Sequence, residues 1–410
     1  MNVQKMMRLD RWLGVPLCFA VTALRALLPA RKPAEKPRSI LFIKLAEQGS
    51  TVLAHRALVE AVRRVGRENV YMAVFEDNRF ILDALGVIPQ ENVVPVCSDS
   101  LAALLRSLLP VLVRLRKLRL DAAIDLEFFA RSSALLTWAS GAATRVGFHA
   151  WFGEGPYRGN LMTHRVRYNP HMHTTQTFAS LVSALDGVPE NFPTFGIQPD
   201  TTGDALPYFT AEPAEIQEMQ ERLARLTVKT TAPRVVLLNA NASDLIPLRR
   251  WSLESYIEVA QRLLARFPGA FIAFTGAKNE AAKAQDLVRR VGSTRCFSLA
   301  GETTLRQLLV LYGLADVLVT NDSGPAHFAA LTPIHTVTLF GPETPLLFAA
   351  LTPRNTPLWA GIACSPCVSA LNNRQSACRD NVCMQRITPD QTFAAVCKSY
   401  LGRQSGVQAA

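Results

Sequence analysis

Residues 315–340, ADVLVTNDSGPAHFAALTPIHTVTLF, contain the unit from which the fold of this chain is predicted. A short apolar strand over 316–320 leads through a polar turn into a helix over 324–331, and a second apolar strand covers 335–340. A right-handed helical crossover returns the chain to the same sheet, so the two strands are expected to be parallel. This stretch therefore predicts an α/β fold with helices on both faces of a parallel sheet.

The same alternation extends through most of the sequence. The other strands are predicted over 39–45, 69–75, 93–96, 122–126 and 145–148 in the first half, and over 234–240, 270–275 and 295–299 in the second. Helices are expected between them, including 51–65, 212–226 and a basic amphipathic helix over 100–118. A chain of 410 residues can bury two cores. The pattern predicts two Rossmann-like, doubly wound lobes with a cleft between them for two substrates.

The N-terminal segment is strongly basic. Of the net charge of +11, residues 1–38 carry +6, from eight basic and two acidic side chains. The uncharged run over 12–24 is shorter than the roughly 20 apolar residues of a membrane span, and Gly14 and Pro16 interrupt it. We expect an interfacial membrane anchor; a signal peptide or true span, or an ordinary packed helix, are the alternatives. No basic stripe with interleaved aromatic residues follows, which disfavours nucleic acid as the partner.

Polar loops follow successive strands of the second half. Neither a Walker loop nor a GxGxxG fingerprint occurs at a strand-to-helix turn, so hydride transfer and P-loop chemistry are disfavoured. The turn at 320–327, TNDSGPAH, places Asp322 at a predicted helix N-cap and Gly324 at the helix start. Backbone N–H groups at such a point can bind phosphate oxygens. The simpler alternative is that Asp322 and Ser323 only cap the helix and that His327 belongs to the core.

The segments TNDSGPAHFAAL (320–331) and VTLFGPETP (337–345) resemble the signature region of glycosyltransferase family 9, the ADP-heptose lipopolysaccharide heptosyltransferases. The resemblance covers roughly 38–401. It implies a GT-B fold and an inverting, metal-independent transfer of heptose from ADP-heptose to a lipopolysaccharide core acceptor, with no cofactor required for catalysis.

The resemblance also implies roles for particular residues. Contacts with the donor phosphates and sugar fall on Asp322, Ser323, Gly324 and His327. The residue that neutralises the donor diphosphate falls on Arg249 or Arg250, for which a solvated arginine pair is the alternative. The acidic residue that holds the adenosine ribose falls near Glu280, for which a solvated surface position is equally open.

The first lobe departs from the family pattern. The loop over 44–53, KLAEQGSTVL, contributes Lys44, Gly49 and Ser50 to the acceptor side, and Ser50 stands where the family has the aspartate that acts as base. Glu47 in the same loop is the predicted base, since an inverting displacement needs one carboxylate within reach of the acceptor oxygen. Asp125 or Glu127 is an alternative. The alternative function is that of a protein without transfer activity, which binds a nucleotide sugar or glycolipid in envelope assembly.

Four cysteines near the C-terminus have the spacing C-x2-C-x10-C-x4-C. The first pair has the spacing of a zinc knuckle, so we predict a structural zinc site. Unliganded or redox-active thiols are the alternative. The four residues are Cys364, Cys367, Cys378 and Cys383.

The predicted organisation has five segments and places the protein on the cytoplasmic side of the inner membrane, as a peripheral protein. The expected partners are a nucleotide sugar and a lipid-linked glycan acceptor. The segments are a membrane-associating part (1–37), an acceptor lobe (38–190), a connection (191–232), a nucleotide-sugar lobe with the cysteines (233–388), and a terminal helix and tail (389–410).

Overall fold

The computed structural model describes residues 3–27, 35–153, 155–188, 206–227, 230, 233–242 and 245–406. Parts of the predicted segments 1–37, 191–232 and 389–410 lie outside these ranges. The chain divides into two compact units. The first comprises residues 1–205 and 369–375, and the second comprises 206–368 and 376–410. The predicted segment boundaries remain predictions.

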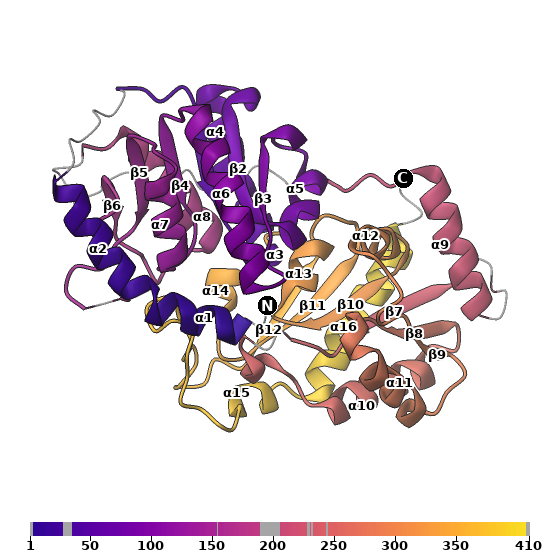
Figure 1. Ribbon diagram of the computed structural model, residues 1–410. Coiled ribbons are helices and arrows are strands. Elements are labelled where there is room, and N and C mark those ends of the chain that lie inside the picture. The colour runs from indigo at the N-terminus through magenta and orange to yellow at the C-terminus, as the bar shows by residue number, and fades with distance from the viewer. Residues whose placement is uncertain are drawn as a thin grey trace. The chain divides into compact units, whose positions relative to one another are not determined.

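The first unit is built on a six-stranded parallel sheet with the order β3-β2-β1-β4-β5-β6 (Figure 1). Ile40 of β1 pairs with Val70 of β2 on one side and with Ala122 of β4 on the other. The strands are β1 (Ile40–Ile43), β2 (Val70–Phe75), β3 (Val93–Val96), β4 (Ala122–Asp125), β5 (Thr144–Phe148) and β6 (His164–Val166). The helices are α1 (Val3–Trp12), α2 (Gly14–Leu27), α3 (Gln48–Leu53), α4 (His55–Val65), α5 (Arg79–Leu85), α6 (Leu101–Leu118), α7 (Arg131–Ala139) and α8 (Thr174–Ser183).

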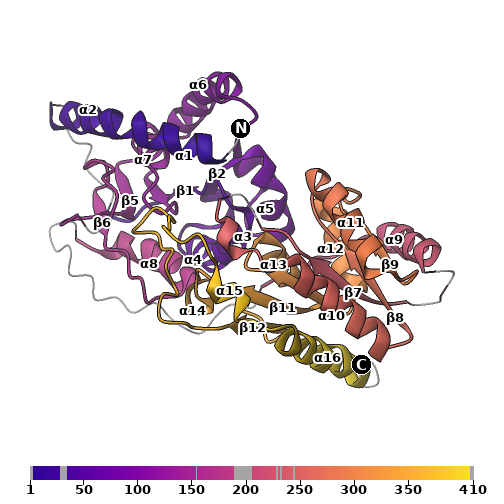
Figure 2. The same ribbon diagram turned by 90° about the horizontal axis from the view of Figure 1, so that it is seen from below.

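The second unit repeats this architecture with the strand order β12-β11-β10-β7-β8-β9 (Figure 2). The strands are β7 (Arg234–Asn239), β8 (Ala270–Phe274), β9 (Cys296–Ser298), β10 (Val317–Asn321), β11 (His335–Phe340) and β12 (Asn355–Trp359). The helices are α9 (Pro213–Leu226), α10 (Leu253–Arg266), α11 (Ala281–Val291), α12 (Leu305–Leu314), α13 (Gly324–Ala329), α14 (Pro345–Phe348), α15 (Val382–Gln385) and α16 (Pro389–Gly406). Short 3-10 turns connect several of these elements.

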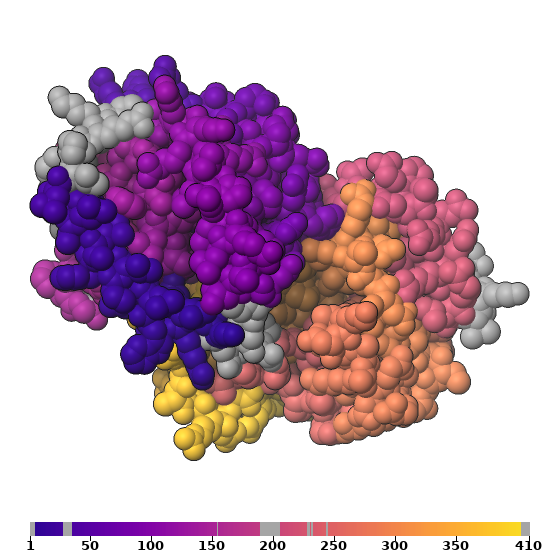
Figure 3. Space-filling model, in the orientation of Figure 1, coloured from indigo at the N-terminus to yellow at the C-terminus, as the bar shows by residue number. Residues whose placement is uncertain are grey.

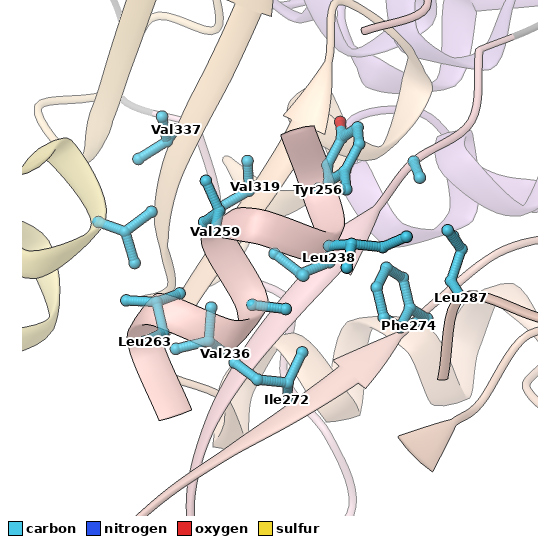
Figure 4. Close-up of a cluster of buried hydrophobic side chains, with 14 of the residues drawn as sticks. Val236, Leu238, Tyr256, Val259, Leu263, Ile272, Phe274, Leu287, Val319 and Val337 are labelled. Carbon is cyan, nitrogen blue, oxygen red and sulfur yellow. The ribbon is translucent and has the colours of Figure 1, made fainter. Parts of the chain in front are cut away.

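Continuous apolar strands form the core of the second unit. Leu238 of β7 and Ile272 of β8 are buried against Tyr256 and Leu263 of α10 (Figure 4). Helix α16 adds Tyr400 to the same cluster. Central parallel strands are buried on both faces, which is why their sequences are apolar without alternation. In the first unit, α6 closes the equivalent core with Val111 and Leu115.

Three details differ from the sequence predictions. The predicted helix over 51–65 is two helices, α3 and α4, which are separated at Ala54. The edge strands β6 and β12 were not predicted. The N-terminal segment forms α1 and α2, and α2 starts at Gly14, where a Cβ atom would lie 2.7 Å from the Cβ atom of Arg131. The described residues include no helix with the length and apolar content needed to cross a membrane.

Candidate active site

Both sheets have a topological switch point, where the strand order reverses direction. It lies between β1 and β4 in the first unit and between β7 and β10 in the second. Ligands of open α/β sheets bind beyond the carboxyl ends of the strands at this point, because the loops diverge there. Residues that the sequence singled out follow each of these four strands, and Glu280 follows β8. Each unit therefore has one candidate half-site, and each is described within its own unit.

Glu47 occupies the loop directly after β1. Its backbone has φ of 67° and ψ of 83°, a left-handed conformation that costs a non-glycine residue roughly 1–2 kcal/mol. Such conformations concentrate at functional sites. The hydroxyl of Ser50 donates to the Glu47 backbone oxygen at 2.9 Å and lies 3.4 Å from its Oε2 atom. The side chain of Glu47 is therefore beside Ser50, the residue that the sequence resemblance puts in the family's aspartate position.

Arg374 holds the carboxylate of Glu47 from a distant part of the sequence. Its Nη1 atom donates to Glu47 Oε1, and its guanidinium lies 5.7 Å from the centre of the Phe128 ring. Arg374 belongs to the short segment 369–375 that groups with the first unit. Burial lowers the pKa of Arg374 to about 10, so it remains a cation at neutral pH. No motif in the sequence indicated a role for this residue.

The alternative bases are engaged differently. Asp125 is fully buried, pairs with Arg158 and accepts a hydrogen bond from Ser133 at 2.9 Å. Burial raises the pKa of Asp125, against the opposing effect of Arg158. Its carboxyl group cannot reach a substrate.

Glu127 supports the loop itself. It accepts from the backbone N–H of Ala46 at 2.8 Å and from Lys44 Nζ at 3.1 Å. Lys44 is fully buried, and burial lowers its pKa while Glu127 opposes that shift. The Glu47 side chain is 27% exposed against 12% for Glu127, which makes Glu47 the more accessible carboxylate.

Arg249 is the centre of a buried ion-pair cluster in the second unit. Its Nε atom lies 3.2 Å from Asp322 Oδ2, and its Nη2 atom donates to Glu343 Oε2. Asp322 and Glu343 are both nearly inaccessible. Burial raises the pKa of Asp322 and Arg249 lowers it, and the upward shift prevails because burial is the larger of the two effects. Glu343, which follows β11, was not predicted as a site residue.

Buried amides join the loops after β7 and β10. Asn321 donates to the backbone oxygen of Asn241 at 3.0 Å and accepts from the backbone N–H of Trp251 at 3.1 Å. Trp251 is in turn fixed by a 2.8 Å bond from its indole nitrogen to Ile387. Arg250, next to it, donates to the backbone oxygen of Ala242 at 3.1 Å. The two arginines are therefore positioned by a rigid, buried frame.

The prediction that Asp322 caps a helix is wrong. Helix α13 starts at Gly324, its N-cap is Ser323, and neither side chain makes a capping bond. Ser323 Oγ instead donates to the backbone oxygen of Asn321 at 3.1 Å, and the Asp322 carboxylate turns to Arg249. The cause is the ion pair, which draws the carboxylate away from the helix. His327 is buried within α13.

Glu280 lies at the end of the loop after β8. Its carboxylate accepts from the backbone N–H of Ala277 at 2.7 Å. Gly276 allows this loop to approach its neighbour, since a Cβ atom there would lie 2.8 Å from the Asn241 amide and 2.9 Å from Glu280 Oε2. Lys283, which the sequence did not single out, lies near enough to both Arg250 and Glu280 for them to influence its pKa, which burial lowers. The ribose role of Glu280 remains a prediction.

The predicted zinc site is not formed. The described residues contain no group of three or more His, Cys, Asp and Glu side chains that could hold a metal ion. Cys364 and Cys378 are exposed and Cys383 is buried. The thiol of Cys378 donates to the backbone oxygen of Asp380 at 3.0 Å, and Cys367 accepts from Ser376 at 3.3 Å.

Solved structures of other proteins share this architecture. The chain superposes on Escherichia coli ADP-heptose lipopolysaccharide heptosyltransferase II with a TM-score of 0.66 and 17% identity, over 89% of this chain and 99% of the other. It superposes on E. coli heptosyltransferase WaaC with ADP-2-deoxy-2-fluoro heptose with a TM-score of 0.56 and 18% identity, over 88% and 99%. The fold is therefore of the GT-B type with two Rossmann-like lobes, as predicted.

Sequence comparison specifies the family. Residues 111–377 match the model of glycosyltransferase family 9 (heptosyltransferase). The chain is 28% identical over 222 residues to lipooligosaccharide heptosyltransferase 2 of Haemophilus ducreyi, covering 52% of this chain and 58% of that protein. The match thus spans little more than half of that curated relative. The chain belongs to glycosyltransferase family 9.

Proposed function

We propose that this protein transfers heptose from ADP-heptose, with inversion and without a catalytic metal, to a lipopolysaccharide core or related glycolipid acceptor. Family membership and the names of the relatives support the reaction type and the donor. The observation that carries the proposal is the position of Glu47. The loop lacks the family's aspartate, and it holds another carboxylate against Ser50, the residue in that place.

Glu47 acts as the general base in this reaction. Its carboxylate takes the proton of the acceptor hydroxyl while that oxygen attacks the anomeric carbon of the donor sugar. The bond between that carbon and the diphosphate oxygen breaks, and ADP leaves with the electron pair. Arg374 fixes the direction of the carboxylate. Positioning of this kind supplies a large part of enzymatic rate enhancement.

The second unit binds the donor. Arg249 or Arg250 offsets the charge that develops on the leaving diphosphate, a form of electrostatic stabilisation that is strong when the groups are held in advance. The support is the buried frame of Asn321 and Trp251, which fixes both arginines. Asp322, Ser323, Gly324 and His327 contact the donor from the loop after β10, and Glu280 contacts the ribose.

The N-terminal segment holds the protein peripherally on the cytoplasmic face of the inner membrane. Trp12, Leu17 and Phe19 of α1 and α2 are exposed, and Arg8 and Arg11 are exposed close to them. An apolar side with basic neighbours suits the boundary between anionic headgroups and acyl chains. A lipid-linked acceptor would be available at that surface.

A second candidate function is favoured by Ser50. The substitution of the family's aspartate suits a protein that binds a nucleotide sugar or glycolipid and takes part in envelope assembly without transferring sugar. Such a protein would retain the donor half-site in the second unit. Replacement of Glu47 would not change the function of such a binding protein, whereas it would abolish sugar transfer by an enzyme. The effect of that replacement therefore distinguishes the two functions.

Donor binding is expected to raise the melting temperature of the protein. Saturating ADP-heptose should raise it by about 5 °C, more than ADP, UDP or GDP, because ligand bound only to the folded state stabilises it. The Asp322→Ala variant should lose this shift, since the carboxylate that orients Arg249 is gone. Thermal unfolding with each nucleotide measures the effect.

The other outcomes of that experiment have distinct meanings. A shift with UDP or GDP that exceeds the one with ADP-heptose would keep the fold and exclude the proposed donor. Wild-type protein that melts at one temperature with every nucleotide would contradict donor binding altogether.

A further inference from the structure

Helix α6 presents an apolar stripe on its outer side. Leu101, Leu105, Leu109 and Val113 follow one another at intervals of four residues, and their exposed fractions are 40%, 60%, 69% and 44%. Residues four apart lie on the same side of a helix. The inner side of α6 packs against the core of the first unit through residues such as Leu115. Four large apolar side chains in a row at the surface are unusual for a protein that contacts only water.

The same helix carries only positive charge. From residue 101 to residue 120 there is no acidic side chain. The basic residues in this stretch are Arg106, Arg114, Arg116, Lys117 and Arg119. A helix that combines exposed leucines with several cations and no anions suits an anionic lipid surface, which attracts the charge and accepts the apolar side chains.

A shallow depression lies at the C-terminal end of the stripe. Its lining combines Val113 and the basic Arg116, Lys117 and Arg119 with Trp138 of α7. Three cationic side chains around a small opening suit a phosphate group. Tryptophan is the side chain that prefers the boundary between headgroups and acyl chains. The depression therefore has the composition of a headgroup site at the edge of an apolar surface.

The stripe continues into the face that carries the N-terminal helices. Trp138, which lines the depression, also packs in the cluster around Cys18 and Val21 of α2. Both ribbon views place α2, α7 and α6 along one side of the first unit (Figures 1 and 2), and α2 and α6 are at the surface of the same face in Figure 3. Thr22 of α2 accepts from the backbone N–H of Asn160 at 3.0 Å, which anchors α2 there.

A second copy of the chain is a poorer occupant of this surface. In a twofold dimer the same surface of both copies forms the interface. A dimer through this surface would therefore bring the basic side chains of one copy against those of the other. Like charges in contact disfavour association. A surface of anionic lipid has the opposite charge.

We propose that the face formed by α2, α7 and α6 docks onto an anionic phospholipid membrane, with the leucines of α6 at the acyl boundary and the Lys117–Arg119 depression on a lipid phosphate. This contact extends beyond the N-terminal segment and is independent of the transfer chemistry. Membrane contact through both α2 and α6 also fixes the orientation of the first unit. With one helix in contact, the unit could still rotate about the axis of that helix.

Co-sedimentation of the full-length protein with vesicles tests the docking surface. Vesicles of phosphatidylcholine alone are compared with vesicles that also contain phosphatidylglycerol, at low and high salt. The Leu105→Gln/Leu109→Gln variant should bind the anionic vesicles at least about tenfold more weakly. Lys117→Gln/Arg119→Gln should lower the affinity for the anionic vesicles about fivefold per charge removed, and by less at high salt. The matched control Leu346→Gln/Leu351→Gln, at exposed leucines of the second unit, should bind as wild type.

Further arms distinguish the sources of binding. Leu17→Gln/Phe19→Gln tests the N-terminal segment separately. When it is combined with an α6 variant, the fold-reductions in vesicle affinity should multiply. Competition with free inorganic phosphate should weaken vesicle binding no more than Lys117→Gln/Arg119→Gln does, since the apolar contacts remain. Unchanged vesicle affinity of both α6 variants would overturn the proposal. So would α6 variants that dissociate a dimer in light scattering while they bind vesicles normally.

Discussion

Replacing Glu47 by glutamine is expected to lower kcat about 10²–10⁴-fold, the usual contribution of a general base. The amide is close to isosteric and can still accept from Arg374, but it cannot take the proton of the acceptor hydroxyl. KM for the donor should change little, because the donor half-site lies in the second unit. Initial rates of ADP release and the thermal shift with ADP-heptose separate the two effects.

Two further variants complete the test of Glu47. Glu76→Gln alters an exposed carboxylate that follows β2 at the same edge of the sheet, and should behave as wild type. Arg374→Ala should lower kcat less than Glu47→Gln, and Arg374→Lys should restore part of it, because an ammonium group still attracts the carboxylate. If Glu47→Gln retains the wild-type rate while Glu127→Gln abolishes it, the base is Glu127.

Replacing Arg249 by alanine is expected to lower the free energy of unfolding by about 3–5 kcal/mol, because it leaves two buried carboxylates without their cation. Donor affinity should fall as well. Denaturant unfolding at neutral pH measures the loss of stability. Arg250→Ala is the matched control: it removes a hydrogen bond to a backbone carbonyl at the adjacent position and should cost about 1 kcal/mol.

The deficit of Arg249→Ala should depend on pH. Burial raises the pKa of Asp322 above its unfolded value near 4, so its protonated form is favoured in the folded state. Such a group contributes stability below its unfolded pKa and loses that contribution as pH rises through the folded pKa. Without Arg249 the pKa of Asp322 is raised further. The loss of unfolding free energy in Arg249→Ala should therefore be greatest at neutral pH and shrink as pH falls toward about 4. A deficit that is the same across this range would contradict a buried carboxylate cluster.

The strands that were predicted correctly are short segments of mostly apolar residues that the sheets bury. β3 and β11 begin and end where the sequence predicted, since Val93–Val96 and His335–Phe340 are each bounded by turn residues. β6 and β12 were missed for the opposite reason. β6 has only three residues, of which two are polar, and β12 is partly exposed along its whole length, so their sequences carry little apolar signal.

The candidate site was predictable where it depends on local sequence and not where it depends on distant contacts. Loops at the carboxyl ends of strands are brought together by the parallel sheet itself, which is how Glu47 and Asp322 could be singled out. Arg374 could not, because it meets Glu47 across 327 residues of sequence. The cysteine spacing around it predicted zinc, and the structure forms no such site among the residues it describes.

Sugar transfer by the purified full-length protein is the decisive test of the proposed reaction. ADP-heptose is supplied with a lipopolysaccharide core acceptor that lacks terminal heptose, and ADP release is followed together with the mass of the acceptor. We expect ADP release that requires the acceptor, one heptose added per acceptor, and loss of both with Glu47→Gln. An acceptor of unchanged mass, with protein that demonstrably binds ADP-heptose, would contradict it and favour the binding function.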